Sequence, residues 1–198
     1  MIYFVTNRHL NKRSYYRIIE EACQSGVDYL ILREKDLGYR EYLEISEKVK
    51  LITDKYKVPL IVNGNIEVCR RLEAYGYHCG YREFMELGKL YSYQGVSVHS
   101  IEEAIEASEA GANYILVGHI YKTKSKEGLE PRGLDFLDQI RKAVSTKVVA
   151  IGGINHKNIN EVRSLKIHGI ALMSYIMESS NLLDSMVLIG NCETISLK

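Results

Sequence analysis

Short runs of hydrophobic residues alternate along the chain with longer segments in which hydrophobic residues recur every three or four positions. The first run covers residues 3–6, and the segment after it covers residues 14–25. In that segment hydrophobic side chains fall at i, i+3, i+4 and i+7, namely Tyr15, Ile18, Ile19 and Ala22. This spacing places them on one face of an α-helix, so the pattern predicts a strand followed by an amphipathic helix.

The same pair of elements recurs eight times. Strands are predicted at residues 3–6, 29–33, 60–63, 77–80, 95–98, 114–117, 148–151 and 169–173. Helices are predicted at residues 14–25, 39–56, 65–74, 83–90, 100–110, 134–144, 157–165 and 182–189. The strand runs are continuously hydrophobic, as in parallel sheets that are buried on both faces. Eight units of about 25 residues favour an α/β fold, a single (β/α)8 TIM barrel. A doubly wound open sheet is the alternative, but it usually lacks eight regular units.

Composition limits the remaining choices. A chain of 198 residues with 46% hydrophobic residues supports one core, so we expect one domain over residues 1–198. The net charge of +1 gives no support for nucleic-acid binding. We expect a cytoplasmic protein without a membrane span, because no apolar run approaches the ~20 residues that a span needs and no signal peptide is visible. The scattered cysteines predict reduced, mostly buried thiols at Cys23, Cys69, Cys79 and Cys192.

Glycines follow the seventh predicted strand and a serine follows the eighth. Active sites of such barrels lie at the carboxyl ends of the strands, and phosphate groups commonly bind after strands seven and eight. Glycine lets backbone N–H groups approach an anion closely, and a helix N-terminus adds a favourable dipole. We therefore predict a phosphate site at Gly152, Gly153 and Ser174. A tight turn that requires glycine is the alternative interpretation.

Two cationic residues end the second predicted strand. Arg33 and Lys35 are two positions apart in an extended segment, so their side chains leave on the same side. Such a pair suits a carboxylate or a second anionic group. The alternative is a surface pair, or a pair neutralised by the neighbouring Glu34 or Asp36.

A glycine-bounded loop, residues 118–128, follows the sixth predicted strand. Its lysines and hydroxyl groups would close over a phosphorylated substrate, and a solvated charged loop is the alternative. His119 lies directly at the end of the strand and is a candidate acid/base, because histidine accepts and returns protons near neutral pH. A structural histidine is the alternative there, and His78 and His99 are weaker candidates.

No metal cluster is predicted. Asn63 is followed by Gly64 rather than by an acid, and the segment after Gly80 offers Glu83 and no aspartate. The carboxylate oxygens that Mg²⁺ prefers are therefore missing from these strand ends.

These motifs together resemble the thiamine phosphate synthase/TenI superfamily, over roughly residues 3–177. The resemblance is specific because eight short segments occur in the family's order and spacing: Leu-Ile-Leu-Arg-Glu-Lys35, Ile-Val-Asn-Gly64, Tyr-His-Cys-Gly80, Gly-Val-Ser-Val-His-Ser100, Gly-Ala-Asn-Tyr114, residues 118–126, Ala-Ile-Gly-Gly-Ile154 and Gly-Ile-Ala-Leu-Met-Ser174. The resemblance implies a TIM barrel that binds phosphate. Synthases of this family join a pyrimidine diphosphate to a thiazole phosphate with Mg²⁺, for which the resemblance implies two aspartates.

Three departures favour the TenI-like thiazole tautomerases over the synthases. Gly64 and the segment 81–84 stand where the two aspartates are expected, and Gly118-His119 stands where synthases have Gly-Pro. The tautomerase pattern also ends its loop as residues 128–133 do here, Gly-Leu-Glu-Pro-Arg-Gly. The resemblance then implies an isomerase without a cofactor, in which His119 is the general acid/base that aromatises a carboxythiazole phosphate tautomer.

Within that hypothesis each polar strand end has an expected role. Arg33 and Lys35 hold the carboxylate, Asn63 and Ser97 orient the ring, and the phosphate binds at Gly152, Gly153 and Ser174 under Thr123 and Lys126. Tyr175 replaces the small residue usual in the family and would narrow the phosphate site. We expect a homodimer. Two other functions remain open: a thiamine phosphate synthase, and a non-catalytic protein that binds thiazole or thiamine phosphate.

Overall fold

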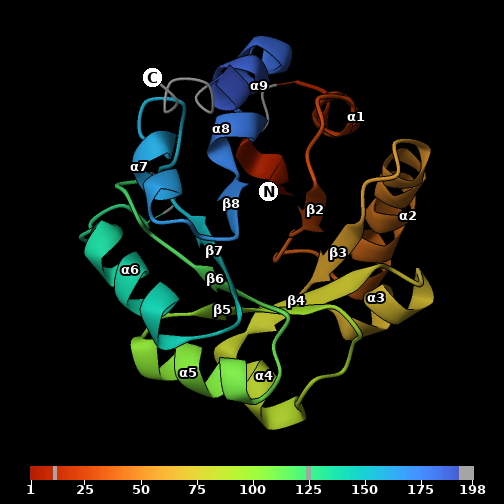
Figure 1. The fold of residues 1–198 in the computed structure, drawn as a ribbon. Coiled ribbons are helices and arrows are strands. Elements are labelled where there is room, and N and C mark those ends of the chain that lie inside the picture. The colour runs from red at the N-terminus through yellow and green to blue at the C-terminus, as the bar shows by residue number, and fades with distance from the viewer. Residues whose placement is uncertain (11–12, 124–125, 192–198) are drawn as a thin grey trace.

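A computed structural model describes residues 1–10, 13–123 and 126–191. Eight parallel strands form a closed barrel in which each strand pairs with its sequence neighbours and β1 pairs with β8. Figure 1 shows the arrangement of the strands and helices. The strands are β1 (Ile2–Val5), β2 (Tyr29–Leu32), β3 (Leu60–Asn63), β4 (Gly76–Gly80), β5 (Gln94–Val98), β6 (Tyr114–Val117), β7 (Lys147–Ile151) and β8 (Gly169–Leu172). The predicted (β/α)8 TIM barrel is confirmed.

Helices connect the strands and cover the outside of the barrel (Figure 1). They are α1 (Tyr15–Gln24), α2 (Tyr39–Lys55), α3 (Ile66–Arg71), α4 (Tyr81–Leu87), α5 (Ile101–Glu109), α6 (Gly133–Ala143), α7 (Ile159–Ser164), α8 (Ser174–Met177) and α9 (Leu182–Asn191). The hydrophobic pattern predicts these helices except α8, and it also misses the 3-10 turn η1 (Arg8–Leu10). Both are single turns, which are too short to show a helical period.

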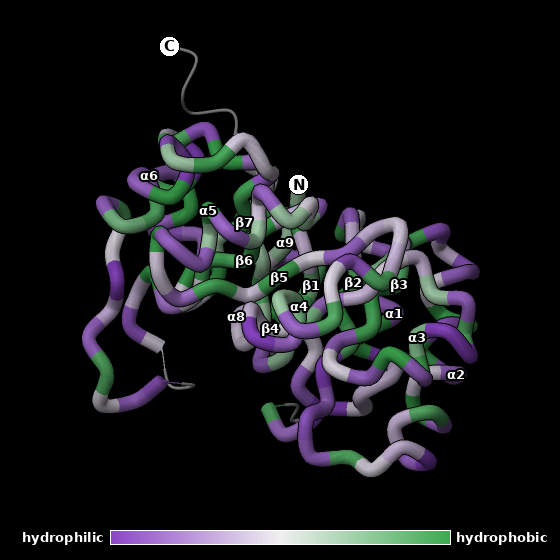
Figure 2. The backbone as a smooth tube through the Cα atoms, turned by 90° about the horizontal axis from the view of Figure 1, so that it is seen from below, coloured by the Kyte–Doolittle hydropathy of each residue, from purple (hydrophilic) through white to green (hydrophobic). Residues whose placement is uncertain are grey.

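The strand side chains form two core layers, one outside and one inside the barrel, because successive side chains of a strand point to opposite faces. The outward side chains pack beneath the helices. The inward ones fill the barrel, and Figure 2 shows hydrophobic residues concentrated along the strands. The buried inward residues are Tyr3, Val5, Ile31, Ile61, Tyr114, Leu116, Val149 and Ala171. Among the described helices, none is long and apolar enough to cross a membrane.

The amino-terminal half of the barrel is filled by tyrosine rings. Tyr3 stacks on Tyr29 with ring centres 4.6 Å apart, and Tyr93 lies 5.6 Å from both Tyr29 and Tyr114. The Tyr3 and Tyr93 hydroxyls are 3.1 Å apart and hydrogen-bonded. This packing leaves the space for a ligand at the carboxyl ends of the strands.

The cysteines agree with the expectation of buried thiols as far as the structure describes them. Cys23, Cys69 and Cys79 are buried and form no disulfide, and burial raises the pKa of each thiol. Cys192 lies outside the described residues.

Candidate active site

A cavity of about 400 Å³ opens at the carboxyl ends of the strands. The structure brings all ten predicted site residues to its wall: Arg33, Lys35, Asn63, Ser97, His119, Thr123, Lys126, Gly152, Gly153 and Ser174. Their roles toward a ligand stay predictions. Hydrophobic side chains from the inner layer, among them Val5, Ile31 and Leu116, form the floor.

Arg33 and Lys35 extend from the end of β2 into this cavity. Among the described residues neither side chain has an ion-pair partner. Burial lowers the pKa of Arg33, and the Arg33 charge is the main cause that lowers the pKa of Lys35. A partly buried cation and a neighbouring cation whose pKa it lowers favour the binding of an anion, which relieves the repulsion.

The neighbouring carboxylates form no ion pair with Arg33 or Lys35, although the Glu34 charge acts to raise the pKa of Arg33. Glu34 is 4% exposed and accepts hydrogen bonds from the Thr6 hydroxyl, at 2.9 Å, and the Tyr15 hydroxyl, at 2.7 Å. Arg8 contacts Glu34 at 3.3 Å and Asp36 at 2.5 Å. Both acids are therefore occupied on the other side of the segment, and the alternative in which they pair with Arg33 and Lys35 is excluded.

The loop after β6 adds a third cation. Lys126 lines the cavity, and its charge contributes to the lowered pKa values of Lys35 and of the nearby His99. The Lys126 amide donates to the Thr123 carbonyl at 3.1 Å, which holds both residues in one turn. Residues 124–125 of the predicted loop lie outside the described part of the chain.

The two glycines after β7 are required by the packing of the backbone. A Cβ atom on Gly152 would lie 2.7 Å from the His119 nitrogen, and one on Gly153 would lie 2.5 Å from the Lys122 carbonyl oxygen. Both glycines have positive φ angles, 113° and 66°. The tight-turn interpretation is therefore correct, and it is compatible with anion binding, because neither glycine N–H donates a hydrogen bond to a described residue.

Tyr175 does not narrow this end of the cavity. Its hydroxyl donates to the Ser185 carbonyl at 3.1 Å and lies 3.1 Å from His156 Nδ1, on the side of α9. The ring does not line the cavity, whereas the preceding Ser174 does. The expectation that Tyr175 narrows the phosphate site is wrong, because the first turn of α8 directs the Ser174 and Tyr175 side chains to different surroundings.

His119 occupies an unusual backbone position. It has a positive φ of 63°, and its carbonyl accepts the Arg132 amide at 2.8 Å. The side chain is 4% exposed and lines the cavity, and Nε2 is buried without a hydrogen-bond partner among the described residues. A buried polar atom without a partner is costly, so a ligand that supplies one would bind favourably.

His78 is a weaker candidate in the sequence, but the structure places it in the cavity wall. It is 3% exposed, and its Nε2 lies 2.8 Å from the Ser97 hydroxyl. Burial, followed by the charges of Arg33 and Lys35, lowers the pKa of His78 to about 3, so the ring is neutral. The His78 backbone carbonyl accepts a hydrogen bond from the side-chain amide of Asn63 at 2.9 Å. A histidine inside an otherwise hydrophobic strand was the available signal.

The described residues do not fit the Mg²⁺ that the resemblance implies for a synthase. No carboxylate of the described residues lines the cavity, and no group of three His, Cys, Asp or Glu side chains suited to a metal is found among them. Gly64 offers no side chain, and Glu83 accepts a hydrogen bond from Tyr77. The cavity instead presents three cations.

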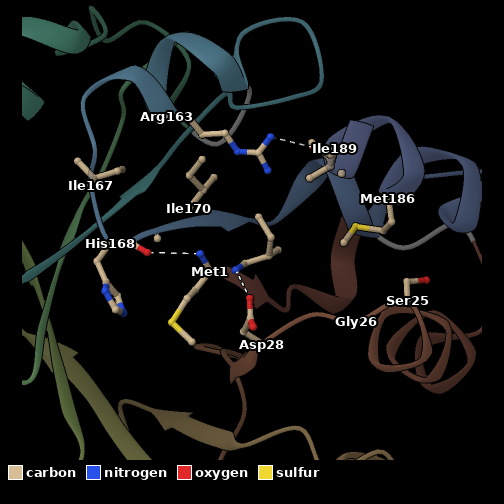
Figure 3. Close-up of a pocket in the computed structure, with 13 residues that line it drawn as sticks. Met1, Ser25, Gly26, Asp28, Arg163, Ile167, His168, Ile170, Met186 and Ile189 are labelled. Atoms are coloured by element: carbon tan, nitrogen blue, oxygen red, sulfur yellow. Dashed lines mark hydrogen bonds between the residues drawn. The ribbon is translucent and has the colours of Figure 1, made fainter. Parts of the chain in front are cut away.

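A second cavity, of about 290 Å³, lies at the opposite end of the barrel between β1, β8 and α9. Figure 3 shows that its polar groups contact other parts of the chain. The Met1 amino group donates to the His168 carbonyl at 3.3 Å, and the Asp28 carboxylate accepts the Ile2 amide at 2.6 Å. Arg163 donates to the Ile189 carbonyl at 3.0 Å. These contacts join Met1 to the segment before β8, β1 to the segment before β2, and α7 to α9.

A family model and two relatives that match most of this chain are named for one reaction. The family model described as thiamine monophosphate synthase matches residues 2–176. A thiamine-phosphate synthase of Clostridium acetobutylicum is 39% identical over 192 residues, covering 92% of this chain and 90% of that protein. One of Clostridium tetani is 37% identical over 182 residues, covering 89% and 87%.

Two solved structures of proteins named thiamine phosphate pyrophosphorylase are similar to this chain. Thiamine phosphate pyrophosphorylase from Pyrococcus furiosus has a TM-score of 0.85 and 28% identity, over 100% of this chain and 96% of that one. The Bacteroides thetaiotaomicron protein of that name has a TM-score of 0.71 at 17% identity, over 100% and 99%, and supports the fold alone.

These findings contradict the prediction of an isomerase of the thiazole tautomerase type. That prediction rested on three loop departures at Gly64, residues 81–84 and His119, whereas the similarity to synthases extends over most of the chain. Loop residues after barrel strands vary without changing the barrel, so a few of them do not identify the reaction. The chain belongs to the thiamine monophosphate synthase family.

Proposed function

We propose that this protein is a thiamine-phosphate synthase, a transferase that joins a pyrimidine diphosphate to a thiazole phosphate and releases pyrophosphate. Support comes from the names of the relatives, at 37% and 39% identity over most of the chain. It also comes from a cavity whose wall suits two anionic substrates.

The observation that carries the proposal is the set of cations without ion pairs. In the reaction a carbon–nitrogen bond forms and the carbon–oxygen bond to the diphosphate breaks. The electron pair of that bond leaves with pyrophosphate, so negative charge collects there. Arg33, Lys35 and Lys126 line the cavity without an ion pair to any described carboxylate. Cations held ready for charge that develops on a leaving group lower the barrier electrostatically.

The thiazole phosphate has its own set of donors in this proposal. Gly152 and Gly153 line the cavity together with Ser174, and neither glycine N–H donates a hydrogen bond to a described residue. Thr123 adds a hydroxyl from the β6–α6 loop. Main-chain N–H groups and hydroxyls of this kind bind a phosphate without adding charge.

His119 takes a different role from the one that the tautomerase hypothesis gave it. Joining the two rings requires no proton transfer at carbon, so a proton carrier is not needed. The buried Nε2 atom lacks a partner among the described residues, and a polar atom of the bound substrate would supply one. His119 is therefore proposed as a substrate-contact residue.

The test is synthesis from purified components. The protein is incubated with both substrates, once with Mg²⁺ and once with EDTA, and thiamine phosphate is measured by fluorescence after oxidation to thiochrome. We expect product in both arms, because the cavity wall supplies cations and the described residues offer no carboxylate set for a divalent ion. Product in the Mg²⁺ arm alone would contradict the role given to the protein's cations. No product in either arm would contradict the synthase.

A second candidate is a protein that binds the phosphates without turnover. The observation that favours it is the same lack of carboxylates at Gly64 and beside Glu83. Calorimetry with thiazole phosphate and with pyrophosphate distinguishes the two, because binding of both without product identifies the binding protein. The homodimer stays a prediction, which light scattering coupled to size-exclusion chromatography tests.

A further inference from the structure

Three polar side chains form a connected path from the centre of the barrel to the cavity. The Tyr114 hydroxyl on β6 lies 2.9 Å from Nδ1 of His78 on β4. Nε2 of the same imidazole lies 2.8 Å from the Ser97 hydroxyl on β5. Tyr114 is fully buried and does not line the cavity, whereas His78 and Ser97 do. The path therefore connects the tyrosine rings in the amino-terminal half of the barrel to the cavity at the carboxyl ends of the strands.

A glycine in the intervening strand makes this path possible. In the barrel register His78 pairs with Gly95, and Gly95 pairs with Tyr114. A Cβ atom on Gly95 would lie 2.0 Å from Cζ of the Tyr114 ring. The phenol ring therefore occupies the space that a side chain of β5 would fill, and it reaches across that strand to the imidazole. The contact is built into the sheet rather than made by chance at a surface.

Burial fixes the direction of the first hydrogen bond. Among the described residues the Tyr114 hydroxyl has no hydrogen-bond acceptor other than His78 Nδ1. Burial raises the pKa of Tyr114 well above its ordinary value, so the phenol keeps its proton. A buried O–H without an acceptor is costly, and the O–H therefore donates to Nδ1.

The direction of the second bond follows from the first. The His78 ring is neutral, because burial and the nearby Arg33 and Lys35 charges lower its pKa to about 3. A neutral imidazole that accepts at Nδ1 carries its proton on Nε2. Nε2–H then donates to the Ser97 oxygen at 2.8 Å. The Ser97 proton is left free to point into the cavity.

We propose that Tyr114 is a positioning residue that acts through His78 to hold the Ser97 hydroxyl as a hydrogen-bond donor to an anionic group of the substrate. The inference rests on the proposed function insofar as the cavity binds a diphosphate or phosphate. It goes beyond that function by giving a role in recognition to a residue that does not touch the cavity.

The first experiment is a double-mutant cycle on the binding of inorganic pyrophosphate, measured by calorimetry in EDTA. Tyr114→Phe keeps the ring that packs against Tyr93 and Tyr3 and removes the hydroxyl. We expect the affinity to fall about three- to tenfold, the value of one hydrogen bond, in both Tyr114→Phe and Ser97→Ala. In the Ser97→Ala background, Tyr114→Phe should cause no further loss.

Tyr3→Phe is the matched control. It removes a phenol from the same cluster, and that hydroxyl bonds to Tyr93 rather than to a histidine. We expect its affinity for pyrophosphate to equal that of the wild type. The proposal is overturned if Tyr114→Phe binds as the wild type does, if its loss adds to that of Ser97→Ala, or if Tyr3→Phe lowers the affinity equally.

The second experiment reads the imidazole directly and needs neither ligand nor synthase activity. Protein labelled with ¹⁵N-histidine is studied by NMR at neutral pH, and the His78 signals are assigned by their loss in His78→Gln. We expect the proton on Nε2 in the wild type and a shift toward the Nδ1-protonated form in Tyr114→Phe. A wild-type His78 protonated on Nδ1 would refute the inference, even if synthesis of thiamine phosphate is observed. Conversely, the expected tautomer without synthesis would refute the proposed function alone.

Discussion

The two ends of this barrel both contain a cavity, and they differ in how their polar groups are satisfied. At the amino-terminal end, in Figure 3, Met1, Asp28 and Arg163 each bond to a main-chain group of another element. At the carboxyl end, Arg33 and Lys35 have no ion-pair partner among the described residues. The volumes, about 290 and 400 Å³, are of the same order.

This difference indicates which end of the barrel stabilises the fold and which end destabilises it. Hydrogen bonds at the amino-terminal end connect Met1 and β1 to the segments before β8 and β2, and connect α7 to α9, so they stabilise the fold. At the carboxyl end, burial lowers the pKa of Arg33 and the Arg33 charge lowers the pKa of Lys35, so these cations cost stability until an anion binds. Unpaired charge, more than volume, therefore identifies the ligand site.

The largest expected effect on ligand affinity separates the two ends through one arginine at each. Arg33→Met should lower the affinity for pyrophosphate roughly 10- to 100-fold, because it removes charge-assisted hydrogen bonds to the ligand. Its Tm without ligand should be no lower than that of the wild type. Arg163→Met should leave the affinity unchanged and lower the free energy of unfolding by about 1 kcal/mol, since it loses the bond to the Ile189 carbonyl. Calorimetry and thermal unfolding of both variants check this, and equal losses of affinity would contradict the assignment.

The glycines test the packing of the carboxyl end. Gly153→Ala adds a methyl group 2.5 Å from the Lys122 carbonyl oxygen at a φ of 66°, so we expect a loss of roughly 2–5 kcal/mol of unfolding free energy. Gly64→Ala has a similar φ of 74° and nothing within 4 Å of the new atom, so the loss should be roughly 1–2 kcal/mol. Urea unfolding measures both. Equal losses would show that the loop after β6 moves aside freely.

The pH dependence of ligand binding tests the cation pair. Lys35 binds an anion best when protonated, and the Arg33 charge lowers its pKa. The affinity for pyrophosphate should therefore decline as the pH rises through this lowered pKa, at a lower pH than an ordinary lysine would require. In Lys35→Met that decline should disappear. Calorimetry between pH 7 and pH 10 measures it, and an unchanged profile in the variant would exclude Lys35 as its source.

The smallest effect is expected for Tyr175. Tyr175→Phe removes bonds to the Ser185 carbonyl and to His156, and should cost about 1 kcal/mol of unfolding free energy. The affinity for thiazole phosphate should stay within error of the wild type, because the ring does not line the cavity. A clear change of that affinity in calorimetry would show that Tyr175 contributes to the phosphate site.

Much of the fold and the location of the candidate site follow from sequence, because both depend on periodicity. Continuous hydrophobic runs predict buried parallel strands, and eight of them close into a barrel. Parallel strands end at one edge, so Arg33, Asn63 and Ser174 meet although they lie far apart in the chain.

What the sequence does not predict depends on side-chain direction and on contacts between distant residues. Glu34 and Asp36 are adjacent to the cations, yet Arg8 and Tyr15 hold them elsewhere. The contact of Tyr114 with His78 depends on the missing side chain of Gly95, which no local pattern shows. The reaction itself was predicted wrongly, because residues such as His119 change a pocket without defining its chemistry.

The most direct test of the proposed function measures both products of one reaction. Wild-type protein and Arg33→Met are incubated with the two substrates in EDTA, and thiamine phosphate and pyrophosphate are quantified together. We predict equal amounts of the two products from the wild type, and a rate reduced roughly 10- to 100-fold in Arg33→Met at substrate concentrations well below saturation. Pyrophosphate released without thiamine phosphate, or equal rates for the two proteins, would contradict the proposal that the unpaired cations at the carboxyl end serve synthesis.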